Sequence, residues 1–350
     1  ITDIPTAITI GSAYIYRVSG TDVSIADGGT NSSAALTNQK VMTSVGGAIV
    51  ESGAITDGEG IQRNNTTFIS APLPLGTCEG RLTLTSGTAI TTADVTAAGT
   101  IYFALYKGDR IYLYDGTRWK LYSFTERSLA LTLTDAKNYD VFIYDNAGTI
   151  TLELSAAWTT DIARADALTA QNGIYVKSGA ATRRYLGTLR ASGTNTTEHS
   201  YTKRFVWNYY NRVETRLYKY SSDTGGHTYT TEAWRNYNNG ATTRVEWIHG
   251  IIESPMRLTG FIRLVSTHVN GYAGYMNLGL NGALARMNAD GAANDVLFQA
   301  NGATSVEARL NTTDFTYGVL GYNYNDLIEF GLPAAGVTYY DGHLKGLFYA

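Results

Sequence analysis

The sequence predicts a mainly β protein, built from antiparallel β-sandwich or jelly-roll-like modules with one short helix, behind an extended N-terminal segment. Short alternating or apolar runs such as TIYFALY, RIYLYDG and RWKLYSF follow one another with turn residues between them. The chain holds 37 Gly and only 5 Pro in 350 residues, which fits many tight turns between strands better than Pro-rich disorder. Even spacing of short antiparallel strands is typical of a sandwich or a barrel.

The composition narrows the classes of partner. Only 16% of the residues are charged, against roughly 25% in typical soluble domains. Thr, Ser, Asn, Gly and 26 Tyr fill the difference, which gives a polar but uncharged surface suited to neutral partners such as glycans. A net charge of -3 and a pI near 6.0 argue against a nucleic-acid partner, which needs a basic face. No stretch approaches the roughly 18 to 20 apolar residues of a membrane helix, so no membrane insertion is expected.

Residues 1–64 are predicted to form an extended, shaft-like attachment segment. Ala7–Val18 is a weakly alternating strand candidate. Gly28–Asn31 precedes a run in which bulky apolar residues are thinly spaced among Gly, Thr, Ser and Asn. Such a segment can hardly fold alone. Either identical segments of other subunits intertwine with it, or it is a flexible linker.

Residues 65–217 are predicted to form a central β-sandwich module. Asp115-Gly116 between strand-like runs is a strong hairpin signal. Tyr139–Tyr144 and Thr149–Leu154 are predicted to form a further hairpin around the turn residues between them.

One short helix is expected to interrupt these strands over Asp161–Ala170. Thr160 or Asp161 would cap its start, and Ile162 would begin the apolar face. Asn172-Gly173 would end it, because these residues adopt the left-handed backbone conformation that follows many helices.

Residues 218–350 are predicted to form a C-terminal β-rich domain. RVEWIHGII, PMRLTGFIRLVST and TYYDGHLKGLFYA are strand candidates between Gly/Asn turns. No repeat of roughly 20 to 50 residues is present, so a β-helix, solenoid or propeller is not predicted.

The sequence contains no recognisable set of catalytic residues. The chain has no G-x-S-x-G elbow and no P-loop, and its five histidines are scattered without an H-E-x-x-H motif, so neither a metal site nor a cofactor is predicted. Cys78 lies in a strand-like sequence and is predicted to be a buried thiol. Asn288–Gly291 with Asn294-Asp295 is either an oxygen-rich calcium turn or a plain Asp-Gly turn.

Acidic residues are the remaining candidates for catalytic groups. A glycoside hydrolase needs two of them, roughly 5 to 9.5 Å apart. The sequence does not show which acidic residues converge, and the chain is predicted not to be an enzyme. The candidates in the C-terminal half are Asp223, Glu232, Glu246, Glu253, Asp314, Asp326 and Glu329.

An aromatic block, KRFVWNYYNRV, closes the central module. In strand geometry Phe205, Trp207 and Tyr209 face one way, while Asn208 and Tyr210 face the other. One face is predicted to enter the core or a subunit interface, and a ligand platform is the alternative.

Two later segments, WRNYNNG and GYNYND, supply the predicted ligand-binding residues. Both combine Trp or Tyr with Asn in predicted loops, the composition expected of a neutral sugar site, and solvent-exposed hairpin tips are the alternative. The predicted residues are Trp234, Asn236, Tyr237, Asn238, Tyr322, Asn323 and Tyr324.

Two stretches carry a resemblance to a known family. Gly28–Asn31, followed by AALTNQKVMTSVGGAIVESGAI, is similar to the shaft and connector segments of bacteriophage tail fibres. ADALTAQNGIYVKSGAATRRYLGTLRASGTN and KRFVWNYYNRV resemble a module of phage virion proteins that are known mostly as structural or fibre-like.

The resemblance implies a homotrimeric virion protein that projects from the particle. It would be a tail fibre or receptor-binding adhesin, contacting host cell-surface polysaccharide through residues 218–350 without catalysis. Residues 1–64 would contact other virion proteins, and trimerisation would cover edge strands. A capsid decoration or head-fibre protein is the alternative. A tailspike depolymerase is the third possibility, disfavoured by the absence of β-helix repeats.

Overall fold

The structure is a computed structural model of the 350-residue chain, and it divides into two compact units. One unit holds residues 1–75 with 118–122, and the other holds residues 76–117 with 123–350. The division at residues 64 and 217 stays a prediction. The structure describes residues 7–10, 13–17, 40–45, 48–54, 59–64, 67–72, 76–266, 275–284, 296–297, 306–331 and 337–350.

The described residues of the N-terminal part form three antiparallel hairpins of two strands each. Within the segment Ala7–Val18, predicted as one strand, the described residues form two antiparallel strands whose pairing is irregular between Ile8 and Thr9. Gly28–Asn31 lies outside the described residues, so the extended character of residues 1–64 stays a prediction. The hairpins are β1 (Ala7–Ile10) with β2 (Ala13–Arg17), β3 (Lys40–Val45) with β4 (Ala48–Ala54), and β5 (Glu59–Asn64) with β6 (Thr67–Pro72).

Short strands fill residues 76–212, as the sequence predicts. The hairpin of Tyr139–Tyr144 and Thr149–Leu154 is confirmed, and its turn residues Ala147 and Gly148 have φ of 50° and 93°, as a tight two-residue turn requires. The strands are β7 (Gly80–Thr83), β8 (Val95–Ala98), β9 (Thr100–Leu105), β10 (Arg110–Tyr114), β11 (Trp119–Ser123), β12 (Arg127–Ala130), β13 (Asn138–Asn146), β14 (Thr149–Leu154), β15 (Leu168–Gln171), β16 (Ile174–Lys177), β17 (Ala180–Gly193), β18 (Thr196–His199), β19 (Lys203–Arg204) and β20 (Val206–Asn208).

The helix predicted over Asp161–Ala170 is wrong. Thr160 forms an isolated bridge with Ala163, and Leu168 begins strand β15, which pairs with β16. Asn172 and Gly173 have φ of 53° and 82°, the two left-handed residues of the β15–β16 hairpin. Left-handed Asn-Gly pairs can end a helix or turn a hairpin, and here the pairing of β16 with β17 selects the hairpin.

The motif RRYLGTLR on β17 places charged residues in the interior. Arg184 has no exposed surface and donates hydrogen bonds to the carbonyl oxygens of Tyr112 at 2.6 Å and Thr77 at 3.0 Å. Arg190 is 6% exposed and donates to Asp161 Oδ1 at 2.8 Å. Buried cations are tolerated when their donors are satisfied in this way. These two guanidinium groups therefore tie β17 to the segments around it.

The aromatic block is part of the core, which confirms the first of its two interpretations. Phe205, Val206, Trp207 and Asn208 are each at most 3% exposed, so both faces of this segment are buried. Asn208 Oδ1 accepts a hydrogen bond from the backbone N–H of Leu82 at 2.7 Å.

No helix of the described residues is long and apolar enough to cross a membrane.

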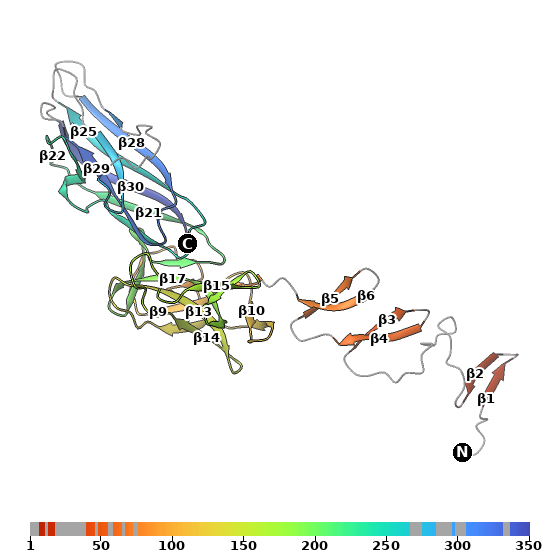
Figure 1. Ribbon diagram of the computed structural model, residues 1–350. Helices are drawn as coiled ribbons and strands as arrows, with labels where there is room; N and C mark the ends of the chain where they lie inside the picture. The colour runs from red at the N-terminus through yellow and green to blue at the C-terminus, as the bar shows by residue number, and fades with distance from the viewer. Residues whose placement is uncertain are drawn as a thin grey trace. The chain divides into compact units, whose positions relative to one another are not determined.

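The C-terminal part is again made of strands, which agrees with the predicted class. β30 lies between β21 and β25 in a five-stranded antiparallel sheet with the order β21-β30-β25-β28 and β22 beside β30 (Figure 1). The strands are β21 (Glu214–Ser221), β22 (His227–Thr228), β23 (Trp234–Asn236), β24 (Val245–His249), β25 (Met256–Ser266), β26 (Tyr275–Leu280), β27 (Val296–Leu297), β28 (Val306–Thr316), β29 (Gly321–Phe330) and β30 (Val337–Tyr349).

A second sheet covers one face of this five-stranded sheet and makes a β-sandwich. β24, β29 and β26 are adjacent in the second sheet. Side chains of both sheets enter one core, in which every member is at most 3% exposed, and burying each large side chain contributes roughly 1.5–3 kcal/mol. The five-stranded sheet contributes Leu217, Leu258, Leu264, Tyr339 and Phe348, and the second sheet contributes Val245, Trp247, Met276, Leu278 and Leu327.

The end of β30 is fixed to a strand far away in the sequence. Arg81 on β7 is 4% exposed and donates from Nη2 to the carbonyl oxygen of Ala350 at 2.6 Å. The backbone N–H and C=O of Ala350 also bond to Val213, at 3.1 and 3.0 Å. Ala350, which directly follows β30, is therefore held in the interior.

Candidate functional site

The outer face of the five-stranded sheet carries cations and aromatic rings. Because side chains alternate along a strand, Leu217, Leu258 and Leu344 point into the core while their neighbours point to solvent. We call these outward side chains the basic aromatic face. Its members are Arg216, Tyr218, Tyr220, Arg257, Thr259, Phe261, Arg263, His343, Lys345 and Leu347.

The strand register places these side chains in rows across the sheet. Leu347 lies opposite Arg216 on one side and Arg257 on the other. In the next row Lys345 lies between Tyr218 and Thr259. In a third row His343 lies between Tyr220 and Phe261. Directly opposed side chains are close enough to interact, so each row is a continuous surface.

Two adjoining hollows open on this face. The first encloses about 350 Å³ and the second about 380 Å³, and both are lined by Phe261 and Lys345. Ligand sites span roughly 300–1,000 Å³, so each hollow has room for a small organic group. The first is further lined by Ile262, Arg263, Asp341 and His343, and the second by Arg216, Arg257, Thr259, Asn311, Thr313, Gly346 and Leu347.

Cations lie over aromatic rings throughout the face. The Lys345 ammonium is 5.2 Å from the centre of the Phe261 ring and 6.0 Å from that of Tyr218. The Arg216 guanidinium is 4.8 Å from the Tyr218 ring. Such cation–π contacts position a charge and leave its other donors directed at solvent. The face can therefore contact a flat apolar group and an anionic group together.

Among the described residues, a single carboxylate, that of Asp341, lines the hollows. Arg263 Nε is 3.9 Å from Asp341 Oδ2, a long contact between partly exposed groups. Arg216 and Lys345 form no ion pair within the described part of the chain. Arg216, Arg257, Arg263 and Lys345 thus outnumber Asp341 by four charges to one along the lining.

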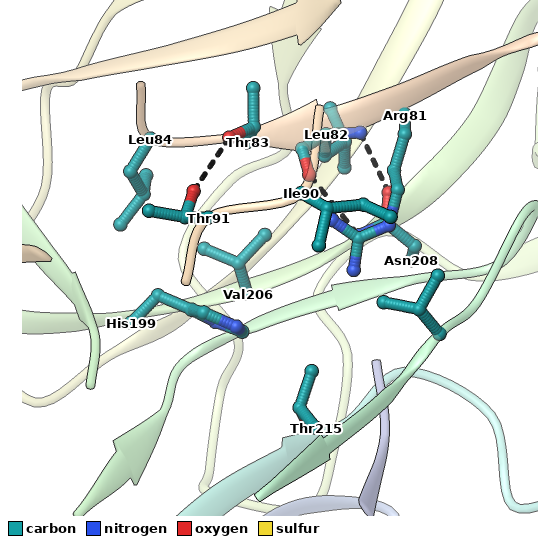
Figure 2. A pocket seen from close by; sticks show the side chains of 11 residues that line it. Arg81, Leu82, Thr83, Leu84, Ile90, Thr91, His199, Val206, Asn208 and Thr215 are labelled. Atoms are coloured by element: carbon teal, nitrogen blue, oxygen red, sulfur yellow. Dashed lines mark hydrogen bonds between the residues drawn. The ribbon is translucent and has the colours of Figure 1, made fainter. Parts of the chain in front are cut away.

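A third cavity is small and lies among the side chains drawn in Figure 2. It holds about 20 Å³ between β7, β18 and β20, room for a single water molecule. His199 lines it, is 9% exposed, and its Nδ1 has no hydrogen-bond partner among the described residues. Burial, with smaller effects from the Arg204 and Arg81 charges, lowers the pKa of His199 well below its ordinary value. A neutral imidazole beside a water-sized space is part of the packing, and no organic ligand fits there.

A charged cluster joins β22, β23 and β29. His227 Nδ1 is 2.6 Å from Asp223 Oδ2, and Nε2 is 2.7 Å from Glu329 Oε2. Arg235 Nε donates to Glu329 Oε1 at 2.7 Å, and Glu329 has no exposed surface. Burial acts to lower the pKa of His227, but hydrogen bonds to Glu329 and Asp223 outweigh it and raise that pKa. The imidazolium can donate to both carboxylates, so the cluster fastens residues 223–235 to β29.

The first set of predicted ligand residues surrounds this cluster. Trp234 and Asn236 are half-buried on β23, which pairs with β29, so this segment is not the predicted loop. Tyr237 begins a short 3-10 helix (Tyr237–Asn239) and has no exposed surface, with its hydroxyl donating to Tyr340 O. Asn238 is exposed. Tyr237 therefore packs into the core.

The second set lies on a strand. Tyr322, Asn323 and Tyr324 belong to β29, and the loop predicted for them is wrong. Asn323 has no exposed surface, and its side chain bonds both N–H and C=O of Val319 at 2.7 Å. The rings of Tyr322 and Tyr324 are half-buried, 5.8 Å apart, and Arg244 lies 4.0 Å from the Tyr324 ring. A ligand role for the partly exposed members of both sets stays a prediction.

The structure also answers which acidic residues converge. Asp223 and Glu329 lie on opposite nitrogens of His227, and Asp326 accepts hydrogen bonds from Arg244 at 2.8 and 3.1 Å. The side chain of Asp314 and the segment Asn288–Gly291 lie outside the described residues.

Sequence reasoning did not find the basic aromatic face. Its members come from three segments far apart in the sequence, 216–220, 257–263 and 343–347, and no single segment is rich in cations. The available signal was the alternation in ETRLYKYS, MRLTGFIRLVS and VTYYDGHLKGLFY, in which many of the charged and aromatic residues stand at every second position.

Comparisons with known proteins show little beyond general similarity. No family model and no curated protein matches the chain. A crystal structure of dimeric latent PorU from Porphyromonas gingivalis is 11% identical, with a TM-score of 0.24, over 63% of this chain and 24% of that one. BuGH86 in complex with neoagarooctaose is 11% identical, with a TM-score of 0.23, over 73% and 34%.

A structure of infectious bursal disease virus, Gx strain, is also similar at this level. It is 11% identical, with a TM-score of 0.25, over 80% of this chain and 74% of that one. The chain spans about a quarter of PorU and about a third of BuGH86. Similarity at these TM-scores does not bear on function.

Proposed function

We propose that this chain is a non-catalytic attachment protein of a bacteriophage particle, with a C-terminal β-sandwich that binds a host cell-surface polysaccharide. The observation that carries the binding proposal is the pair of hollows that adjoin over Phe261 and Lys345. Aromatic rings contact the apolar faces of ligands at modest entropic cost, and the surrounding polar groups fix orientation. The assignment to a phage particle is supported by the sequence resemblance.

The proposed assembly is a homotrimer, in which residues 1–64 contact other virion proteins. Each subunit would present one basic aromatic face, so several weak contacts would act together and raise avidity by a factor of roughly 10² to 10⁴. Analytical ultracentrifugation of the full chain should give three times the chain mass of 37.9 kDa. A monomer at micromolar concentration would contradict the trimer without touching the binding proposal.

The binding proposal is tested with the full chain, a panel of bacterial isolates and their purified surface polysaccharides. We expect binding to a subset, and Phe261→Ala should weaken it at least tenfold because the ring is shared by both hollows. Tyr106→Ala is the matched control, since Tyr106 is an aromatic residue 36% exposed elsewhere on the unit. Circular dichroism verifies that both variants fold. Wild-type protein that binds nothing, or Phe261→Ala protein that binds as well as wild type, would refute the proposal.

A further inference from the structure

We infer that the ligand of the basic aromatic face is an anionic polysaccharide, one that carries carboxylate, sulfate or phosphate groups. The inference rests on the proposed function and goes beyond it, because the composition of the whole chain favours neutral glycans. That composition gives a net charge of -3. The described residues that line the two hollows have the opposite sign, with four cations to one carboxylate.

Two of these cations are available for a ligand. Arg216 and Lys345 are exposed and have no ion pair with a described residue, and the rings beneath them hold their charged groups in place. A neutral ligand that covers Arg216 and Lys345 would displace the water around both charges. It would replace that water only with hydrogen bonds to neutral acceptors, so the exchange is unfavourable. An anion returns charge-assisted hydrogen bonds, which are roughly twice as strong as neutral ones.

The charges are arranged along a line. Arg257 and Arg263 lie on the same face of β25, six residues apart, which corresponds to about 20 Å at 3.3 Å per residue. Lys345 pairs with Thr259, between them. A chain molecule with repeated anionic groups can contact several of these cations at once, whereas a single small anion contacts one.

The aromatic rings favour a polysaccharide over other polyanions. Phe261 is shared by both hollows, and Tyr218 and Tyr220 flank Lys345 and His343 in neighbouring rows. Sugar rings offer apolar faces to such side chains while their substituents reach the cations. Nucleic acid would need a more extensive basic surface than four cations on a chain of pI near 6.0.

Matched polymers test the inference on the full chain. Dextran sulfate and dextran share a backbone and differ in charge, and polygalacturonate and its methyl ester differ in the same way. We expect the sulfated and carboxylated polymers to bind at least tenfold more tightly than their neutral counterparts. Rising salt should weaken only the anionic polymers, since salt screens exposed charges.

Charge-removing variants then locate the site. Arg216→Gln and Lys345→Gln should each weaken dextran sulfate binding about tenfold, equivalent to roughly 1.4 kcal/mol. Lys107→Gln is the matched control, because Lys107 is 5.9 Å from the Tyr106 ring and lies in neither hollow. It should bind as wild type does.

The outcomes separate this inference from the proposed function. Equal binding of charged and neutral polymers, or no effect of Arg216→Gln and Lys345→Gln while Phe261→Ala abolishes binding, overturns the anionic ligand and leaves the glycan-binding face intact. Tighter binding of poly(dT) than of dextran sulfate overturns the polysaccharide in favour of nucleic acid. A chain that binds no polymer and no bacterial surface overturns both.

Discussion

The charge state of His249 should make the stability of the sandwich depend strongly on pH. His249 lies on β24, is 2% exposed, and its ring is 5.1 Å from Phe348. Its Nδ1 has no hydrogen-bond partner among the described residues. Burial lowers the pKa of His249 to about 4, against a small upward effect of a hydrogen bond to Val319 and a downward effect of Arg212.

The size of the effect follows from that pKa. In the unfolded chain a histidine titrates near 6.5, so between about pH 6.5 and 4 the unfolded state binds a proton that the folded state does not. Stability is therefore complete above pH 6.5 and is lost as the pH falls. Each pKa unit is worth about 1.4 kcal/mol, so this residue alone should remove between about 2 and 3 kcal/mol by pH 4.5.

Urea unfolding at pH 7.5 and 4.5 measures this loss. His249→Leu removes the titrating group, so the loss of unfolding free energy between the two pH values should shrink by between about 2 and 3 kcal/mol relative to wild type. Trp247→Phe is the control: it alters the same part of the core, where the indole Nε1 is also buried without a partner among the described residues, but adds no titration. If His249→Leu and wild type lose the same free energy, the buried neutral histidine is not what makes the fold sensitive to acid.

The remaining predictions concern His227, Gly173 and Cys78. His227→Phe leaves the buried carboxylate of Glu329 with Arg235 alone and should cost about 3 kcal/mol in urea unfolding. Because folding raises the pKa of His227, the cost should be full below about pH 6.5 and fade as pH rises through the folded pKa; a cost independent of pH would contradict the ion pair. Gly173→Ala should lower stability by about 1 kcal/mol, measured by thermal unfolding, because φ is 82° there; unchanged or raised stability would contradict the left-handed turn. Burial raises the pKa of Cys78 to about 11, so a thiol reagent at pH 8 should react only after urea unfolds the chain, and rapid reaction of native protein would contradict that burial.

The class of fold could be predicted from the sequence because turn residues and alternating apolar runs are local signals. Asp145–Gly148 between two alternating runs specifies a hairpin by itself, and the structure contains it. The error at Asp161–Ala170 has the same origin. Asn172-Gly173 supports a helix end and a hairpin turn equally, and only the neighbouring strand β17, which is folded over from later in the chain, decides between them.

The candidate site could not be predicted from local sequence signals. Phe261, His343 and Tyr220 become neighbours only through the pairing of β21 and β25 with β30, across separations of about a hundred residues that no local pattern encodes. Density of Tyr, Trp and Asn pointed instead to Tyr237 and Asn323, which have no exposed surface. Aromatic and amide groups satisfy a core as readily as they bind a ligand, so composition alone does not separate the two roles.

The central position of β30 also governs how the sandwich can assemble. β21, β25 and β28 are synthesised before β30, yet β21 pairs with β30 at Glu214↔Tyr349, across 135 residues. Closing so long a loop is slow, and until it closes β21 and one edge of β25 expose unpaired backbone that can join other chains. Deleting Val337–Tyr349 would therefore leave β21 and one edge of β25 without a paired strand. Folding yield should depend more on this last strand than on any residue that binds a ligand.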